Sequence, residues 1–258
     1  MINLFILYAF LAGIGTWLIT ALGSSLVFFI KSENKKILSL VMGLGAGIMI
    51  AASFFSLILP SLEQLENSGR SNIEAILGFF VGGIFLFIFD LFLGKLEKKR
   101  NTSSDNQKSN KLLFLAITLH NIPEGLAIGV AFGLAMDSNL DANLINAFLL
   151  ALGIGLQNFP EGLAISLPLN QNGMSKRKAF TYGQLSAIVE PVSAIMGVIL
   201  IYFVEMILPF VLCFASGAML YVVVEELIPN GKISKDDKMC TLGIIFGYVI
   251  MMFLDLLF

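Results

Sequence analysis

Two stretches of the chain, 37 residues apart, carry the residues best suited to chemistry: HNIPEGLAIGV from His120 and QNFPEGLAISL from Gln157. In each, a polar side chain precedes a glutamate by four residues. His120 and Glu124 therefore share one helical face, as do Gln157 and Glu161. Imidazole, carboxylate and amide groups together suit a first-row divalent cation such as Zn²⁺, Fe²⁺ or Mn²⁺. The doubled motif predicts a metal site.

The elements that must position these residues belong to a membrane protein. Of 258 residues, 57% are hydrophobic and 13% charged, whereas an average soluble domain has about 25% charged residues. The mean hydropathy is +0.88. Apolar runs of about 20 residues, the length that crosses a bilayer, predict an all-α polytopic membrane protein with eight transmembrane helices in a single domain, 1–258. The expected ranges are 3–30, 37–60, 73–94, 111–136, 143–169, 179–204, 207–228 and 240–258, with a longer polar connection at 95–111.

Basic residues fall almost entirely on alternate connections between these helices. Of the 16 Lys and Arg residues, 15 lie in the odd-numbered connections, and only Arg70 lies on the other side. The positive-inside rule then places the odd-numbered connections in the cytoplasm and both termini outside it. The two PEGLAI motifs are consequently expected on helices that run in opposite directions.

A weaker echo relates GIMIAASFFSLILP, in the helix 37–60, to GAMLYVVVEELIP, in the helix 207–228. These two helices are expected to be opposed as well. Inverted repeats with helices broken by Gly and Pro at matching places are typical of transporters and indicate a binding site near the midplane. Pro123 and Pro160 each remove a backbone hydrogen bond, and the carbonyls that they free favour a polar cavity. Gly125 and Gly162 allow another backbone to come close.

Three acids lie near the centres of apolar helices: Glu124, Glu161 and Glu190. Each charge at such a depth costs about 2.5–3.5 kcal/mol on insertion scales. No Lys or Arg lies at that depth to pair with them. The acids are therefore either protonated or neutralised by a cation. Asn121 and Asn158 point about 100° round their helices, toward an adjoining position.

At these residues the chain resembles the ZIP (Zrt-, Irt-like) family of divalent-metal transporters, and most of all its prokaryotic GufA-type branch. The similarity covers essentially the whole chain and includes HNIPEG, QNFPEG and the polar connection at 95–111. It implies transport of zinc, or of iron, manganese or cadmium, into the cytoplasm, without enzymatic activity and without a resident cofactor. It also implies a homodimer. The expected location is the bacterial inner membrane.

The resemblance further implies a binuclear metal centre midway through the membrane. The first position would combine a thioether, an imidazole, an amide and two carboxylates: Met49, His120, Gln157, Glu124 and Glu161. The second would combine two amides with a carboxylate, bridged by the acids of the first position: Asn121, Asn158 and Glu190, with Glu124 and Glu161. On the residues alone, Met49 is better explained as an ordinary lipid- or core-facing side chain, and its role as a ligand is implied by the resemblance.

Two positions depart from many relatives. Gln157 stands where many have His, and a neutral amide is the weaker ligand. Asn158 stands where some have Asp, which removes one negative charge from the second position. Both departures weigh against full occupancy by two ions.

Five polar residues outside the motifs are candidates for the transport route: Ser53, Ser56, Asp90, Glu225 and Glu226. The two serines lie one and two turns beyond Met49 on the same face. The acids lie at the cytoplasmic ends of their helices and could equally be interfacial charges.

Two other functions remain open on the residues alone. An intramembrane metal-dependent hydrolase would use a histidine and glutamates to hold a catalytic zinc, although the chain has no second histidine and no HExxH motif. A proton-coupled carrier of organic solutes would use the carboxylates as a proton relay without a metal.

Overall fold

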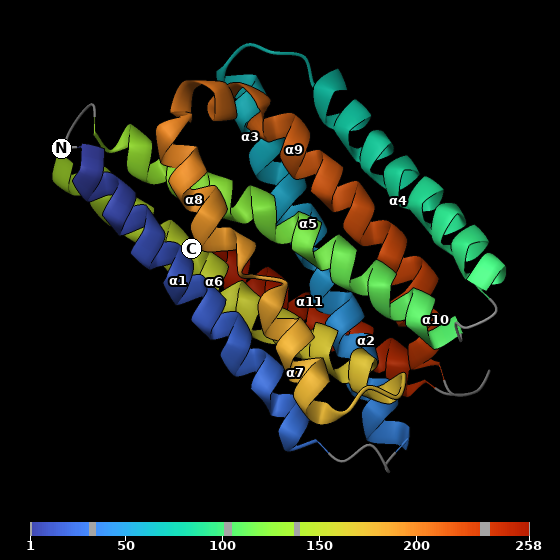
Figure 1. Cartoon of the computed structure of the whole chain (residues 1–258). Coiled ribbons are helices and arrows are strands. Elements are labelled where there is room, and N and C mark those ends of the chain that lie inside the picture. Colours follow the sequence, from blue (N-terminus) through green and yellow to red (C-terminus); the bar gives the residue numbers. More distant parts are fainter. Residues whose placement is uncertain (1, 31–34, 101–104, 137–139, 233–237, 258) are drawn as a thin grey trace.

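The computed structural model describes residues 2–30, 35–100, 105–136, 140–232 and 238–257, which form a helical bundle without a strand (Figure 1). The elements in chain order are α1 (Ile2–Ser25), η1 (Leu26–Phe28), α2 (Lys35–Ala52), η2 (Ser53–Ile58), α3 (Leu59–Asn67), α4 (Ile73–Arg100), α5 (Asp105–Leu134), α6 (Leu140–Gln171), α7 (Lys176–Leu185), α8 (Val189–Ile199), α9 (Ile201–Val222), η3 (Val223–Leu227), α10 (Ile228–Gly231) and α11 (Met239–Leu257). The prediction of an all-α protein is confirmed for the described part of the chain.

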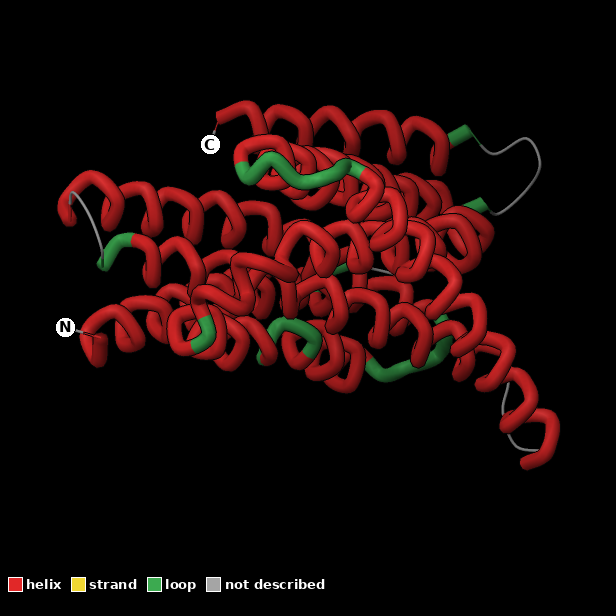
Figure 2. Tube along the Cα trace, turned by 90° about the horizontal axis from the view of Figure 1, so that it is seen from above, coloured by secondary structure: helices red, strands yellow, loops and turns green. Residues whose placement is uncertain are grey.

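Seven helical segments of the described chain are long and apolar enough to cross a membrane: Ile2–Phe28, Ser39–Asn67, Ile73–Phe92, Leu113–Leu134, Leu144–Gln171, Lys176–Ile199 and Met206–Glu225. The eighth expected helix corresponds to α11, whose apolar stretch Met239–Leu254 is shorter. A count of eight spans therefore stays a prediction. The helices run side by side along a common direction (Figure 2), and the two ends of the chain lie toward the same end of the bundle (Figure 1).

The helices form two groups. In the first, α1 packs against α6 and α8, and α5 packs against α8; in the second, α2 packs against α11, and α4 packs against α9. The groups meet where α5 contacts α9 and where α2 contacts α6. The two PEGLAI motifs belong to α5 and α6, so both lie on helices that contact the opposite group.

The echo between the helices 37–60 and 207–228 has a counterpart in the backbone, because both contain a π-helical turn just before a proline. In η2 the last of these wide hydrogen bonds runs from the N–H of Leu59 to the carbonyl of Phe54, and Pro60 is the next residue. In η3 the N–H of Ile228 donates in the same way to Val223, one residue before Pro229. Such wide turns are rare and are frequent at functional sites. They carry the helices past the prolines, so the end predicted at 60 is wrong and the helix continues to Asn67.

The prolines of the other helices have different effects. The helices α5 and α6 continue through Pro123 and Pro160, as the predicted ranges 111–136 and 143–169 do. By contrast, the helix expected at 179–204 is interrupted at residues 186–188, between α7 and α8. Pro191 cannot donate a hydrogen bond to the preceding turn, and the N–H of Glu190 instead closes a tighter turn with Ala187. The interruption sets Glu190 at the beginning of α8.

Close helix contacts beside the motifs depend on two glycines. A Cβ atom at Gly125 would lie 2.6 Å from the carbonyl oxygen of Glu190, and one at Gly162 would overlap the carbonyl oxygen of Thr20. Both distances are too short for a side chain, so these positions let α8 approach α5 and α1 approach α6. The close approach expected at both glycines is confirmed.

Replacing Gly162 with alanine should therefore loosen the α1–α6 contact. We expect Gly162→Ala to destabilise the detergent-solubilised protein by about 1–3 kcal/mol, as overpacking does in other cores. Thermal unfolding followed by size-exclusion chromatography measures this. The matched control is Gly15→Ala on α1, where a Cβ meets no atom within 4 Å; equal melting temperatures for the two variants would contradict the assigned contact.

Candidate metal centre

The centre of the site is a buried histidine that faces two acids from two helices. The Nε2 atom of His120, on α5, lies 3.1 Å from Glu161 Oε1, on α6, and 3.3 Å from Glu124 Oε1 one turn along its own helix. All three side chains are almost completely buried, and their possible ligand atoms lie within 4.8 Å of one another. The sequence motif predicted the first pair by spacing; the fold adds Glu161 from the opposed copy.

Acceptor atoms around this cluster lack donors. Glu124 Oε2, Asn121 Oδ1 and Gln157 Oε1 are buried and accept no hydrogen bond. The described ion pairs of Glu124 and Glu161 are with His120 alone. Buried acceptors without donors are costly, and several of them in one place favour a bound cation. Imidazole, carboxylate and amide donors fit a first-row divalent ion.

The second predicted position is arranged differently. The Nδ2 atom of Asn158 lies 2.9 Å from Glu190 Oε1 and 3.0 Å from Glu190 Oε2, so one amide donates to both oxygens of the carboxylate. Both residues are buried, and Asn158 Oδ1 accepts no hydrogen bond. In this conformation the amide stands where a cation on Glu190 would stand. Aspartate in place of Asn158 would repel Glu190 instead.

A cavity of about 520 Å³ leads to the cluster from one end of the bundle. Its deep end is formed by Glu124 and Gln157, and its outer part by Gln64, Leu134 and Asn146. Apolar side chains of α5, α6 and α9 form most of the remaining wall. Of the two positions, the cavity therefore reaches the first, through one carboxylate and one amide.

The other predicted residues have separate surroundings. Ser56 lines the cavity, whereas the hydroxyl of Ser53 donates to the carbonyl of Met49, 2.9 Å away. Met49 is buried among the apolar side chains of the core, and its role as a ligand stays a prediction.

Of the acids suggested for the route, Asp90 and Glu225 do not line this cavity. Asp90 is buried between α4 and α9, where the hydroxyl of Tyr221 donates to Asp90 Oδ2 at 3.2 Å. Glu225 is exposed in η3. The side chain of Glu226 lies outside the described residues. The hydrogen bond of Asp90 indicates a contact between helices, and roles for these acids in transport stay predictions.

Two polar residues of the cavity wall were missed by the sequence analysis: Gln64 and Asn146. The sequence intervals between these residues and the predicted ones could have identified both. Gln64 is two turns beyond Ser56 on one helical face, and Asn146 is 11 residues, close to three turns, before Gln157. In an apolar helix, a polar residue on the same face as a candidate ligand thus indicates where the access route runs.

A membrane bundle that directs a cavity to buried acids, which among the described residues have no Lys or Arg partner, has the features of a cation transporter. The model of the family described as ZIP Zinc transporter matches residues 6–112 and 110–255. The chain is 37% identical to zinc transporter ZIP11 of Xenopus tropicalis, over 97% of each chain. It is 36% identical to zinc transporter GufA of Myxococcus xanthus, over 92% of this chain and 93% of the relative, and 32% identical to zinc transporter ZupT of Clostridium perfringens, over 98% and 96%.

The chain belongs to the ZIP family of zinc transporters. It is a multi-pass membrane protein, and the resemblance to the GufA branch is confirmed. Membership in a transporter family also confirms that the protein is not an enzyme, which removes the intramembrane hydrolase.

Thiol labelling tests the cavity. We expect a cysteine at position 146 (Asn146→Cys) to react with a small water-soluble thiol reagent, because Asn146 lines the cavity. The native Cys213 and Cys240 are buried and should stay unlabelled. The control is Leu152→Cys on the same helix: Leu152 is exposed on the bundle surface but does not line the cavity, so in the membrane it should face lipid. Faster labelling at 152 than at 146 would argue against the cavity.

Proposed function

We propose that this protein carries a divalent transition-metal ion, zinc above all, across the membrane into the cytoplasm. The ion binds between α5 and α6, on His120, Glu124, Gln157 and Glu161. The observation that carries the proposal is the cluster of buried acceptors, with two acids against one histidine at hydrogen-bond distance. A doubly positive ion neutralises both acids and occupies the acceptors that lack donors.

The choice of zinc rests on the names of the relatives, which are zinc transporters. The ligand types themselves are less selective, because imidazole, carboxylate and amide groups also bind iron, manganese and cadmium. The set holds no thiolate, unlike many structural zinc sites, so the ion should be released more readily than from such a site. The thioether of Met49 is proposed as a further ligand, since α2, which carries Met49, packs against α6.

The direction of transport follows from the charge distribution and the cavity. We assign the odd-numbered connections to the cytoplasm, both termini to the outside and eight spans to the single domain, since 15 of the 16 basic residues then lie inside. The cavity opens at the end that carries Gln64, Leu134 and Asn146, which this orientation makes the outside. Ions would thus reach Glu124 from outside. We further propose a homodimer in the bacterial inner membrane.

The binuclear arrangement requires a second ion to displace the amide of Asn158 from Glu190. Asn121, Asn158 and Glu190 would hold that ion, bridged by Glu124 and Glu161. Because the amide donates to both oxygens of Glu190, it competes directly with the cation. Asn158 therefore determines how readily the second position fills.

Flux measurements test the transport site. Purified protein in liposomes should admit Zn²⁺ and Cd²⁺, and Glu124→Ala should reduce the flux to that of protein-free liposomes, because the variant loses the acid that meets the cavity. Glu66→Ala is the matched control, since Glu66 is exposed on α3 and does not line the cavity. Undiminished flux in Glu124→Ala would remove the assignment.

The same preparation separates metal transport from a proton-coupled carrier of organic solutes. Elemental analysis of the purified protein should find a transition metal in stoichiometric amount, and Glu161→Gln should lose it. A metal-free protein that stays metal-free after incubation with Zn²⁺ would favour the organic-solute carrier.

Ion stoichiometry tests the role of Asn158. At a Zn²⁺ concentration that just fills the first position, we expect Asn158→Asp to raise the bound Zn²⁺ from about one to about two ions per chain, because the new carboxylate cannot donate to Glu190 and adds a ligand charge. Equilibrium dialysis with elemental analysis measures the stoichiometry. Asn170→Asp, on the same helix but bonded to the carbonyl of Met174, should leave it unchanged. Two ions bound by the unsubstituted protein would contradict the assigned competition.

A further inference from the structure

A second cavity lies at the mouth of the first. It has a volume of about 600 Å³ and shares Pro60, Gln64 and Leu134 with the cavity that leads to Glu124. Its remaining lining comes mainly from the end of α3, the α3–α4 connection and α9: Glu63, Asn67, Ser68, Arg70 and Met206. We call this cavity the vestibule. Because the two cavities share these three residues, a cation in the vestibule lies beside the route to the metal centre.

The vestibule contains an arginine, which is unexpected beside the path of a cation. Arg70 is the basic residue that the charge distribution sets apart from the other 15, and it is the only Lys or Arg among the described lining residues. An uncompensated guanidinium would repel a divalent ion. It would act at the point where water still surrounds the ion and where approach determines the rate of capture.

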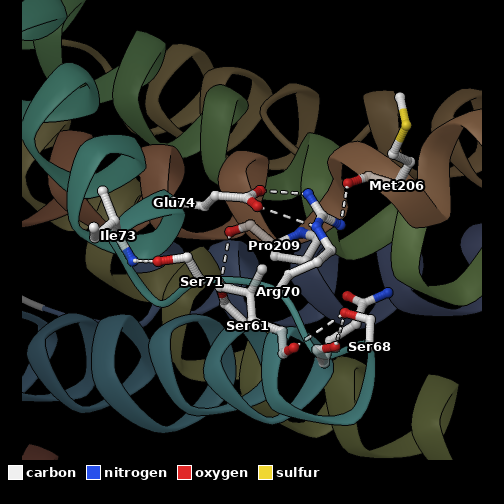
Figure 3. A network of polar contacts seen from close by, with 10 residues as sticks. Ser61, Ser68, Arg70, Ser71, Ile73, Glu74, Met206 and Pro209 are labelled. Carbon is white, nitrogen blue, oxygen red and sulfur yellow. Dashed lines mark hydrogen bonds and ion pairs between the residues drawn. The ribbon is translucent and has the colours of Figure 1, made fainter.

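Arg70 is held in a two-pronged ion pair. Its Nε donates to Glu74 Oε1 at 3.1 Å, and its Nη2 forms an ion pair with Glu74 Oε2, while Nη1 donates to the carbonyl of Met206 at 2.6 Å (Figure 3). The two side chains are about a third exposed. This planar geometry is the favourable one for arginine and carboxylate. It fixes the guanidinium against α4 and α9 and sets one negative charge beside its positive charge.

With the pair intact, the uncompensated charge among the described lining residues is that of Glu63, which is exposed. The vestibule therefore attracts cations as a result of two arrangements: Glu63 faces it, and Glu74 cancels Arg70. Loss of the Glu74 charge would change the summed charge of Glu63, Arg70 and Glu74 from −1 to zero and leave the guanidinium of Arg70 uncompensated beside the vestibule.

We propose that Glu74 is a positioning residue for cation capture. By neutralising Arg70 it keeps the vestibule attractive to the hydrated divalent ion, without contacting the ion at the metal centre. The inference rests on the proposed function, because it assigns a role within that transport. Arg70 in turn ties the α3–α4 connection to α9 through the carbonyl of Met206, which gives this basic residue a structural role.

The test is a double-mutant cycle on Zn²⁺ uptake into liposomes. Glu74→Gln should raise the KM about fivefold at low salt, the effect of one unit charge on a divalent ion roughly 8 Å away in water. The kcat should be unchanged, because the metal centre is intact. The difference should shrink at high ionic strength through screening, and the double variant Arg70→Gln with Glu74→Gln should recover the original KM. Glu66→Gln, which removes an exposed acid that does not line the vestibule, is the control.

Three results would overturn the proposal: an unchanged KM in Glu74→Gln, a salt-independent rise, or the same rise in the double variant, which would indicate lost loop geometry. If Glu74→Gln does not fold, Glu63→Gln provides the same test, since it removes the attracting charge and should raise the KM with the same salt dependence. Absence of uptake by the unsubstituted protein would instead count against the proposed function. Uptake that survives Glu124→Ala would do the same.

Discussion

The structure depends on one electrostatic constraint, which is that three carboxylates are buried in an apolar bundle and none of them has a Lys or Arg partner among the described residues. Glu124, Glu161 and Glu190 are almost completely buried. One histidine serves the first two and an amide serves the third. Burial of charge is tolerated only where a partner is supplied. The cavity that ends at Glu124 gives that partner a way in, so the cost of the acids and the route of the ion are parts of the same arrangement.

The opposed repeats explain how a short motif builds such a site. Each PEGLAI copy supplies one acid, and a glycine follows it at the same place, so a neighbouring helix backbone comes close beside each acid. The other group of helices also contains a matching pair of features, the π-helical turns before Pro60 and Pro229. The two copies then diverge in chemistry: one begins with His120 and the other with Gln157. The cavity is lined by Gln157 but not by His120.

Local spacing was enough to predict part of this arrangement. The i, i+4 pairing of His120 with Glu124, the close approach at Gly162 and the apolar helices all follow from short-range rules. Contacts that depend on tertiary packing did not follow. The amide of Asn158 turns to Glu190 and the hydroxyl of Tyr221 to Asp90, and both require knowing which helices are neighbours. The effects of prolines were predicted unevenly. The predicted helix 111–136 runs through Pro123, as α5 does, whereas the predicted helix 179–204 lacks the interruption that precedes Pro191 in the structure.

The central claim is that a metal ion neutralises the acids between α5 and α6. Anomalous X-ray diffraction at the zinc absorption edge, from crystals grown with Zn²⁺, tests it most directly. We predict a strong peak within coordination distance of His120 Nε2, Glu124 and Glu161, which lie close together without the ion. A peak confined to surface acids, or no peak beside His120 at saturating zinc, would contradict it.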